Sequence, residues 1–285
     1  MKKHLLAALA ALGAVVAAVP AAAKEKPPVF VVASAVKDKP AVALDPTKAY
    51  ILLRTANAAP LYLMKVPTAE DQATYDRVRA AALAEAREKY GKKAASYERA
   101  RAAAAKSPGL SVPEKPVEPT EANFEFVQFG MMASVGIGPM NRFAKSKELS
   151  TYLHEVTAGT YRVYGQLAAP AGAAAIGSCF CMGSVKFDAP AGAIVDLGVI
   201  DPPVVQEPTP GDSSQPAVAD TKPLFRPAGT DMPIDPRLSA AKIVSAAFKA
   251  VGKLPNYYGV TISRIPEMPG VMRYDRDRIV DLTAQ

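Results

Sequence analysis

The sequence predicts a mainly β protein, an antiparallel β-sandwich that carries a long helical insertion and a small helical C-terminal extension. Three observations lead to this fold class. Short segments rich in β-branched and aromatic residues recur along the chain, and many are bounded by Gly, Pro, Asn or Asp. One long segment, 67–106, consists mostly of strong helix formers. Two proline-rich stretches, 107–121 and 201–236, suit neither a helix interior nor a central strand, and they divide the chain.

Alternating side chains in the expected strands indicate sheets with one face toward a core and one toward solvent. Tyr161 and Val163 are expected to face the core, whereas Tyr164 and Gln166 are expected to face solvent. We expect the short turns "TAGT" and "APAG" to join antiparallel neighbours. The expected strands are 28–34, 48–55, 60–66, 123–130, 151–156, 160–168, 178–187 and 193–200.

The segment 67–106 predicts a long amphipathic helix inserted between two strands. Thr68 and Asp71 have the spacing of a capping box, with the shorter acid in place of Glu or Gln. Leu83, Tyr90 and Tyr97 recur every seven residues and mark one side of the helix. The proline-rich strap 107–121 is long enough, when extended, to return along most of such a helix. A helical hairpin broken at the glycine in position 91 is the alternative, and the sequence favours the single helix.

The C-terminal part follows the proline-rich linker 201–236. The stretch "DPRLSAAKIVSAAFKAVGK" predicts a second helix near 235–253. "YYGVTISRI" at 257–265 is a candidate strand, and 271–282 is either another strand or a tail. The expected organisation is therefore a sandwich domain over 24–200, which contains the insertion and the strap, then the linker, then an extension over 237–285.

The N-terminus has the features of a secretory signal peptide. Two lysines precede an apolar run over residues 5–19, and Ala21 to Ala23 offer small residues for cleavage after position 23. The run is short for a bilayer-spanning helix, which disfavours the alternative of an uncleaved anchor. No cysteine follows it, so the chain lacks a lipoprotein processing site. We therefore expect a bacterial protein that is periplasmic or secreted.

The charge distribution along the sequence excludes some partner classes. The chain carries a net charge of +7, and removal of residues 1–23 takes away two lysines and no acids, which leaves 32 basic and 27 acidic residues. Charges of both signs alternate, and no five like charges are consecutive. Nucleic-acid or membrane-surface binding requires a concentrated patch, which the sequence does not display. No segment after the signal peptide reaches the roughly 18 apolar residues of a transmembrane helix.

Two segments carry a resemblance to a known family. "TYLHEVTAGTYRVYG" at 151–165 and "GSVKFDAPAGAIVDLG" at 183–198 resemble the hairpins of small secreted bacterial β-sandwich domains, a domain-of-unknown-function family with a Pro-Gly-x-Tyr turn and an "aGxxxdLG" ending. Here Ala158-Gly159-Thr160-Tyr161 stands where that turn is usual. The resemblance covers roughly 120–200. It implies a periplasmic or outer-membrane-associated β-sandwich and transfers no active site. This chain lacks the lipobox cysteine of the lipoprotein members.

The only two cysteines lie in "GSCFCMGS", as Cys179 and Cys181, next to Met182. Cysteine and methionine sulfurs bind Cu(I), so these residues, with His154 assisting, are the candidate metal ligands. In an extended strand the two thiols share one face with Val185 and point toward the core, while Met182 points away from them. Structural thiols are therefore the favoured interpretation, and a disulfide or redox pair and a copper site are the alternatives.

The remaining motifs do not form a catalytic constellation. His154 is the only histidine after residue 23, and we expect it at the surface or rim of a sheet. Asp275 and Asp277 alternate with arginines, which indicates a self-compensating solvated face. The sequence therefore predicts a non-catalytic interaction or structural module of the cell envelope that needs no cofactor and whose partner is an envelope protein or surface. The alternative is a periplasmic copper-binding or thiol-redox protein that uses the Cys-x-Cys pair.

Overall fold

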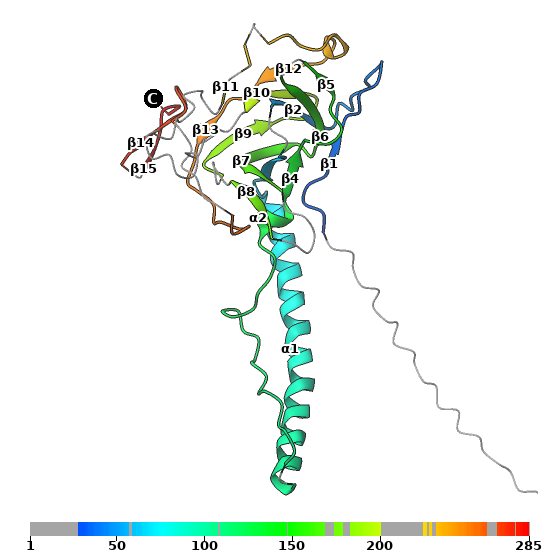
Figure 1. Cartoon of the computed structure of the whole chain (residues 1–285), viewed down its shortest axis with the longest axis vertical. Coiled ribbons are helices and arrows are strands. Elements are labelled where there is room, and N and C mark those ends of the chain that lie inside the picture. The colour runs from blue at the N-terminus through cyan, green and yellow to red at the C-terminus, as the bar shows by residue number, and fades with distance from the viewer. Residues whose placement is uncertain are drawn as a thin grey trace, which may run out of the picture.

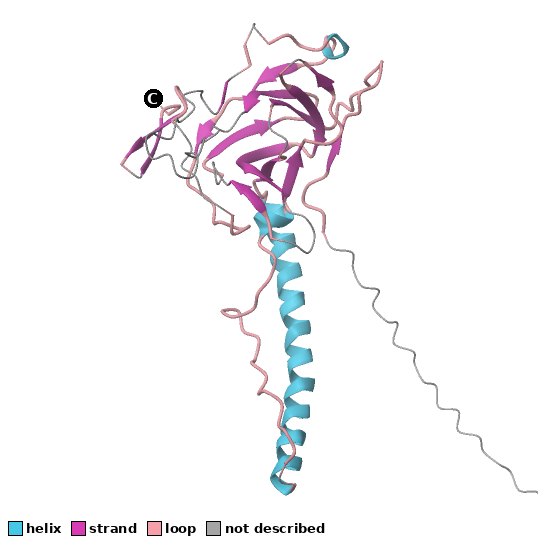
Figure 2. Cartoon of the chain, in the orientation of Figure 1, coloured by secondary structure: helices cyan, strands magenta, loops and turns pink. Residues whose placement is uncertain are grey.

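The computed structural model describes residues 28–56, 59–107, 109–146, 148–168, 174–178, 183–200, 225–226, 228–229, 232–260, 267–276 and 278–284. Two β-sheets form the body, and one long helix projects from it (Figures 1 and 2). The mainly β class and the long helix are therefore confirmed. Within the described residues, no helix is both long enough and apolar enough to span a bilayer.

The first sheet is mixed rather than antiparallel. Its strand order is β1-β6-β2-β10-β11, with β5 beside β6 and β12 beside β10. β10 runs parallel to both β2 and β12, and the other pairs are antiparallel. The strand bounds are β1 (Ala33–Ala35), β2 (Ala49–Thr55), β5 (Ala144–Lys145), β6 (Ser150–Val156), β10 (Ile194–Ile200), β11 (Phe225–Arg226) and β12 (Ile243–Ser245).

The second sheet is antiparallel throughout, in the order β13-β9-β7-β3-β4 with β8 beside β7. A separate hairpin follows near the C-terminus. The sequence allowed either a strand or a tail at this position. The bounds are β3 (Leu61–Lys65), β4 (Ser134–Ile137), β7 (Gly159–Ala168), β8 (Ile176–Ser178), β9 (Val185–Ala189), β13 (Lys249–Ala250), and β14 (Met272–Asp275) with β15 (Arg278–Asp281) for the hairpin.

The two sheets share one apolar core. Ile51 and Leu53 of the first sheet pack in the same cluster as Leu63 and Val163 of the second, and all four are fully buried. The turns "TAGT" and "APAG" do not join paired neighbours as expected. Each carries the chain from one sheet to the other, because β6 and β10 belong to the first sheet and β7 and β9 to the second. The two strands that each of these turns connects, β6 and β7 or β9 and β10, therefore lie in different sheets.

The predicted solvent face of the second sheet is covered. Tyr164 and Gln166 are buried, contrary to expectation. The C-terminal segment lies over Tyr164: the Tyr164 hydroxyl donates to the Pro255 carbonyl at 2.9 Å, and the Tyr257 ring stacks on that of Tyr164 at 6.1 Å. Gln166 lies beyond a shift in the register between β7 and β3, opposite Leu61 of the core, and its Nε2 donates to Thr55 Oγ1 of the first sheet at 3.4 Å. Alternation within one strand reports which side chains point the same way. It does not report whether a distant segment covers the outer face.

The predicted C-terminal helix at 235–253 is wrong. Only a 3-10 turn, Pro236–Leu238, forms at its start, and the short strands β12 and β13 follow. β12 pairs with β10, so that Ile243 lies beside Ile194. Pairing at an open sheet edge and burial of β-branched side chains outweigh the helix propensity of the alanine-rich stretch.

Other boundaries also differ from expectation. The stretch 28–34 contributes only its last two residues to a strand, and 123–130 forms an extended segment leading into α2 (Phe129–Met132). Strand 178–187 is divided between β8 and β9, and the residues between 178 and 183 lie outside the described part. Residues 257–260 are not a strand, and 261–266 are not described.

Candidate functional site: a projecting helical arm

The helix α1 (Ala69–Lys106) is one continuous element that runs through position 91, as the sequence favoured. Its N-terminus is fixed by the predicted capping box: Thr68 Oγ1 accepts from the Asp71 amide at 3.1 Å, and Asp71 Oδ2 accepts from the Thr68 amide at 2.9 Å. Asp71 Oδ2 also accepts from Nζ of Lys65, the buried last residue of β3. Burial acts to raise the pKa of Asp71, but the hydrogen bonds from Lys65 and Thr68 outweigh it and lower that pKa.

Aromatic side chains anchor the root of the helix to the body. The Tyr75 ring lies 5.7 Å from that of Phe126 and 5.9 Å from that of Phe129, and Phe129 lies 4.8 Å from Phe30. The Tyr75 hydroxyl also donates to the Val127 carbonyl at 3.1 Å. The root of α1 is therefore held to α2 and to the segment before β1. Its direction is set by contacts rather than by a flexible linker.

Residues 109–128 return along one side of α1 (Figure 1). Arg79 pairs with the Glu121 carboxylate and donates to its carbonyl, and Arg87 Nε donates to the Pro119 carbonyl at 3.2 Å. The partly covered positions of α1 include Tyr90 and Tyr97, on the predicted heptad side. We call α1 together with 107–128 the arm. The predicted long helix is thus confirmed, and the segment that follows it lies along it.

The arm stands away from the sheets (Figure 1). At about 1.5 Å per residue, the 38 residues of α1 extend roughly 57 Å. Leu83 is its only buried residue, and the side opposite the return segment is exposed along the distal half. Glu85–Lys89 and Glu88–Lys92 form i,i+4 ion pairs there, which support a helix without tertiary packing. The arm therefore presents a long, regular surface that no described part of the body covers.

A cleft of about 740 Å³ lies at the root of the arm. Tyr75, Asp76 and Arg79 line it from α1, and residues 122–126 with Gln128 line it from the return segment. Two of its charged groups already have partners: Asp76 accepts from Gln72 at 2.8 Å, and Arg79 pairs with Glu121. The cleft therefore offers rings and polar atoms for binding, without a nucleophile held by a base.

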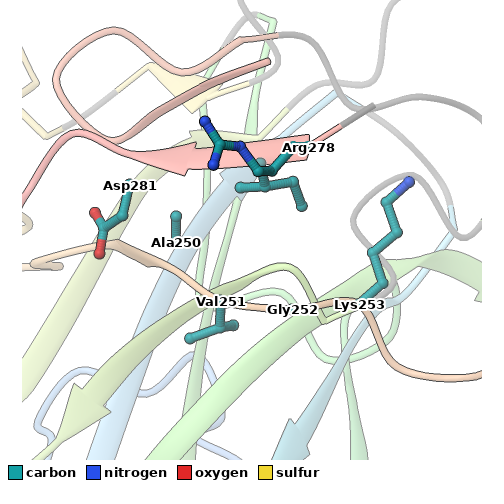
Figure 3. Close-up of a pocket in the computed structure, with 7 residues that line it drawn as sticks. Ala250, Val251, Gly252, Lys253, Arg278 and Asp281 are labelled. Atoms are coloured by element: carbon teal, nitrogen blue, oxygen red, sulfur yellow. The ribbon is translucent and has the colours of Figure 1, made fainter. Parts of the chain in front are cut away.

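A second pocket, of about 460 Å³, lies between β13, the residues that follow it and β15 (Figure 3). Asp281 lies at the opposite end from Lys253. The Asp281 carboxylate accepts from the Thr283 amide and hydroxyl, and these hydrogen bonds lower its pKa. Arg278 pairs with Asp275 at 3.0 Å. Asp281 and Arg278 are thus satisfied by near neighbours, and the charged groups do not converge on a ligand position.

The candidate metal ligands can be placed only in part. Cys179, Cys181 and Met182 lie outside the described residues, so their side-chain directions stay a prediction. Among the residues that are described, no group of three or more His, Cys, Asp or Glu side chains is arranged to hold a metal ion. The expected self-compensating face near Asp275 agrees with its pairing to Arg278, while Asp277 is not described.

His154 is not at a surface or rim, as the sequence led us to expect. It is 6% exposed and shares a face of β6 with Tyr152 and Val156, which belong to the core between the sheets. Its Nδ1 is buried without a hydrogen-bond partner. Burial lowers the pKa of His154 to about 4, so the imidazole is neutral at pH 7. Alternation placed the side chain on the correct face of the strand, but it did not show which face is buried.

Acid should therefore destabilise the protein through His154. Its folded pKa of about 4 lies below the ordinary 6.5, so the unfolded state binds a proton that the folded state does not as pH falls from about 6.5 to about 4. We expect this histidine alone to lower the free energy of unfolding by about 2 to 3 kcal/mol between about pH 7 and about pH 4.5. Urea denaturation at both pH values measures the loss. On acidification, the free energy of unfolding of His154→Leu should fall by about 2 to 3 kcal/mol less than that of the wild type. An equal fall in both proteins would contradict the prediction.

No protein-family model, curated protein or solved structure matches the chain. The resemblance of residues 120–200 to secreted bacterial β-sandwich domains accordingly stays an expectation.

Proposed function

We propose that the protein is a non-catalytic binding module of the cell envelope, in which the two sheets form a β-sandwich base and the arm carries the binding surface. One observation carries this proposal: α1 continues for 38 residues while burying only Leu83. Packing among the described residues gives no reason for the distal half of the helix, because of these residues only the return segment lies along it. A surface that serves a partner accounts for its length and exposure.

The root of the arm supports the same role. The capping box, the Lys65–Asp71 pair and the Tyr75 ring contacts fix the direction in which the helix leaves the body. A fixed direction lowers the entropy lost on binding compared with a freely moving helix. The signal peptide, the envelope location and the sandwich topology belong to this proposal as expectations from the sequence.

Site-specific photo-crosslinking in the producing cells tests the proposal. A photoreactive phenylalanine derivative replaces Ser96, on the exposed side of α1, or Ser245, an exposed residue of β12 that serves as the matched control on the body. We expect irradiation to join the Ser96 variant to an envelope component, protein or lipid, and to leave the Ser245 variant unmodified. Adducts from Ser245 with none from Ser96 would show that the body, not the arm, binds the partner.

A further inference from the structure

We infer that the distal arm, residues 89–113, docks on an anionic phospholipid surface. This inference rests on the proposed role of the arm and names the chemistry of its partner. It differs from the sequence expectation, which looked for consecutive like charges and found none. In the folded protein, α1 places on one exposed surface basic residues that are separated from one another in the sequence.

The net positive charge of the chain is concentrated in the distal arm. Residues 89–113 contain six basic residues and one acidic residue, a net charge of +5. The chain from residue 24 onward contains 32 basic and 27 acidic residues, also a net charge of +5. The rest of that chain is therefore balanced, with 26 residues of each sign. By contrast, the root half of α1, residues 69–88, has five acids and three bases. The charge is thus polarised along the helix, positive at the end far from the body (Figure 1).

These cations are available to a partner. All six are exposed, and five of them fall within a sector of about 140° that does not include Tyr90, at 100° per residue. The five are Lys89, Lys92, Lys93, Arg99 and Lys106. Lys93, Arg99 and Lys106 form no ion pair with any described residue, so three full charges face solvent without local compensation. A face of this kind attracts anionic lipid headgroups over about a Debye length.

The end of the arm adds exposed apolar side chains to the cations. Leu110 is 57% exposed and Val112 is 41% exposed, immediately after the helix ends. From position 99 through position 113 the chain has no acidic residue, and the last helical turns contain four consecutive alanines. Basic residues beside exposed apolar groups are typical of segments that lie in the interface of an anionic bilayer.

Parallel pairing of the arm with that of a second copy of the chain is disfavoured by the same charges. Two distal arms that met side by side would each bring a net charge of +5, and the repulsion would oppose pairing. Polyanionic polymers share the charge of an anionic bilayer, but they give the exposed Leu110 and Val112 no apolar phase to enter.

Vesicle co-sedimentation tests this inference. The purified protein without residues 1–23 is mixed with vesicles of phosphatidylcholine alone, or with vesicles in which about a third of the lipid is phosphatidylglycerol. We expect binding only to the second kind, reduced by added salt. Because each basic residue near an anionic surface contributes about 1 kcal/mol, or roughly five-fold in affinity, Lys93→Gln with Arg99→Gln and Lys106→Gln should weaken binding about a hundred-fold.

The matched control carries the same charge change on the body, as Lys37→Gln with Lys145→Gln and Lys242→Gln, all exposed positions. It should bind like the wild type, and Leu110→Ser with Val112→Ser should weaken binding. Equal losses from the arm and body triples would overturn the inference, as would complexes with dextran sulfate in the absence of any vesicle binding. If Ser96 crosslinks to an envelope protein and the vesicles stay unbound, the lipid inference fails while the proposed role of the arm stands.

Discussion

Replacing Asp71 by alanine is expected to lower the free energy of unfolding by about 3 to 5 kcal/mol, the cost of removing one partner of a buried ion pair. Lys65, whose side chain is 5% exposed, would keep its charge in the body without a carboxylate. The start of α1 would also lose the carboxylate half of its capping box. Both losses act at the root of the arm, so helical signal should disappear at lower urea concentration. Denaturation followed by far-ultraviolet circular dichroism measures the change.

Two further variants separate the buried pair from a general effect of removing an acid. Glu88→Ala breaks the exposed pair with Lys92, whose side chain is 75% exposed, and should change stability little. Adding Lys65→Met to Asp71→Ala removes the uncompensated charge and should recover much of the lost free energy of unfolding. If Asp71→Ala costs no more than Glu88→Ala, the Lys65 contact does not hold the arm to the body.

The second large effect is expected at Asp196, on the outer face of the first sheet. Asp196 Oδ1 and Oδ2 accept from Nη1 of Arg54 at 2.7 and 3.0 Å, and Oδ1 also accepts from the Gly198 amide at 2.8 Å. Both side chains are more than 90% buried. Asp196→Ala would leave the Arg54 guanidinium and the Gly198 amide without this acceptor. We expect the free energy of unfolding to fall by about 3 to 5 kcal/mol, measured by urea denaturation.

Removing the whole pair should be less harmful than removing half of it. Arg54→Met combined with Asp196→Leu replaces the ions by apolar groups of similar size, and we expect this double variant to lie closer to the wild type than Asp196→Ala does. Asp275→Ala, which breaks an exposed pair with Arg278, is the surface control and should change stability little. A loss at Asp196 as small as that at Asp275 would contradict the assignment of Arg54 and Asp196 as a buried pair.

The elements that the sequence predicted well are those whose signals are local. Thr68 and Asp71 determine the start of α1 through hydrogen bonds within four residues, so spacing alone identified the capping box. The strands around Ile51, Leu63 and Val163 are rich in β-branched or large apolar residues, and they form the shared core. Sheet membership could not be predicted in this way, because a turn such as "TAGT" fits a hairpin and a crossing between sheets equally well.

The features that were missed depend on contacts between distant segments. Ile243 is part of a strand because β10 lies beside it, and Tyr164 is buried because Pro255 and Tyr257 cover it. His154 was placed on the correct face, but its burial depends on the second sheet. The candidate site, too, depends on the arrangement of the folded chain. The basic residues of the distal arm lie among alanines and other residues in the sequence. They form a basic surface only because α1 projects from a body whose charges balance.

Hydrogen–deuterium exchange of the purified protein, with and without envelope membranes from the producing cells, tests the central claim most directly. Without membranes, amides in the distal half of α1 should exchange faster than those of β2 and β7, because few tertiary contacts cover them. Adding membranes should slow exchange in residues 89–106 and leave the two sheets unchanged. Protection that appears in the sheets while the distal half of α1 keeps its exchange rate would contradict the claim that the arm is the binding surface.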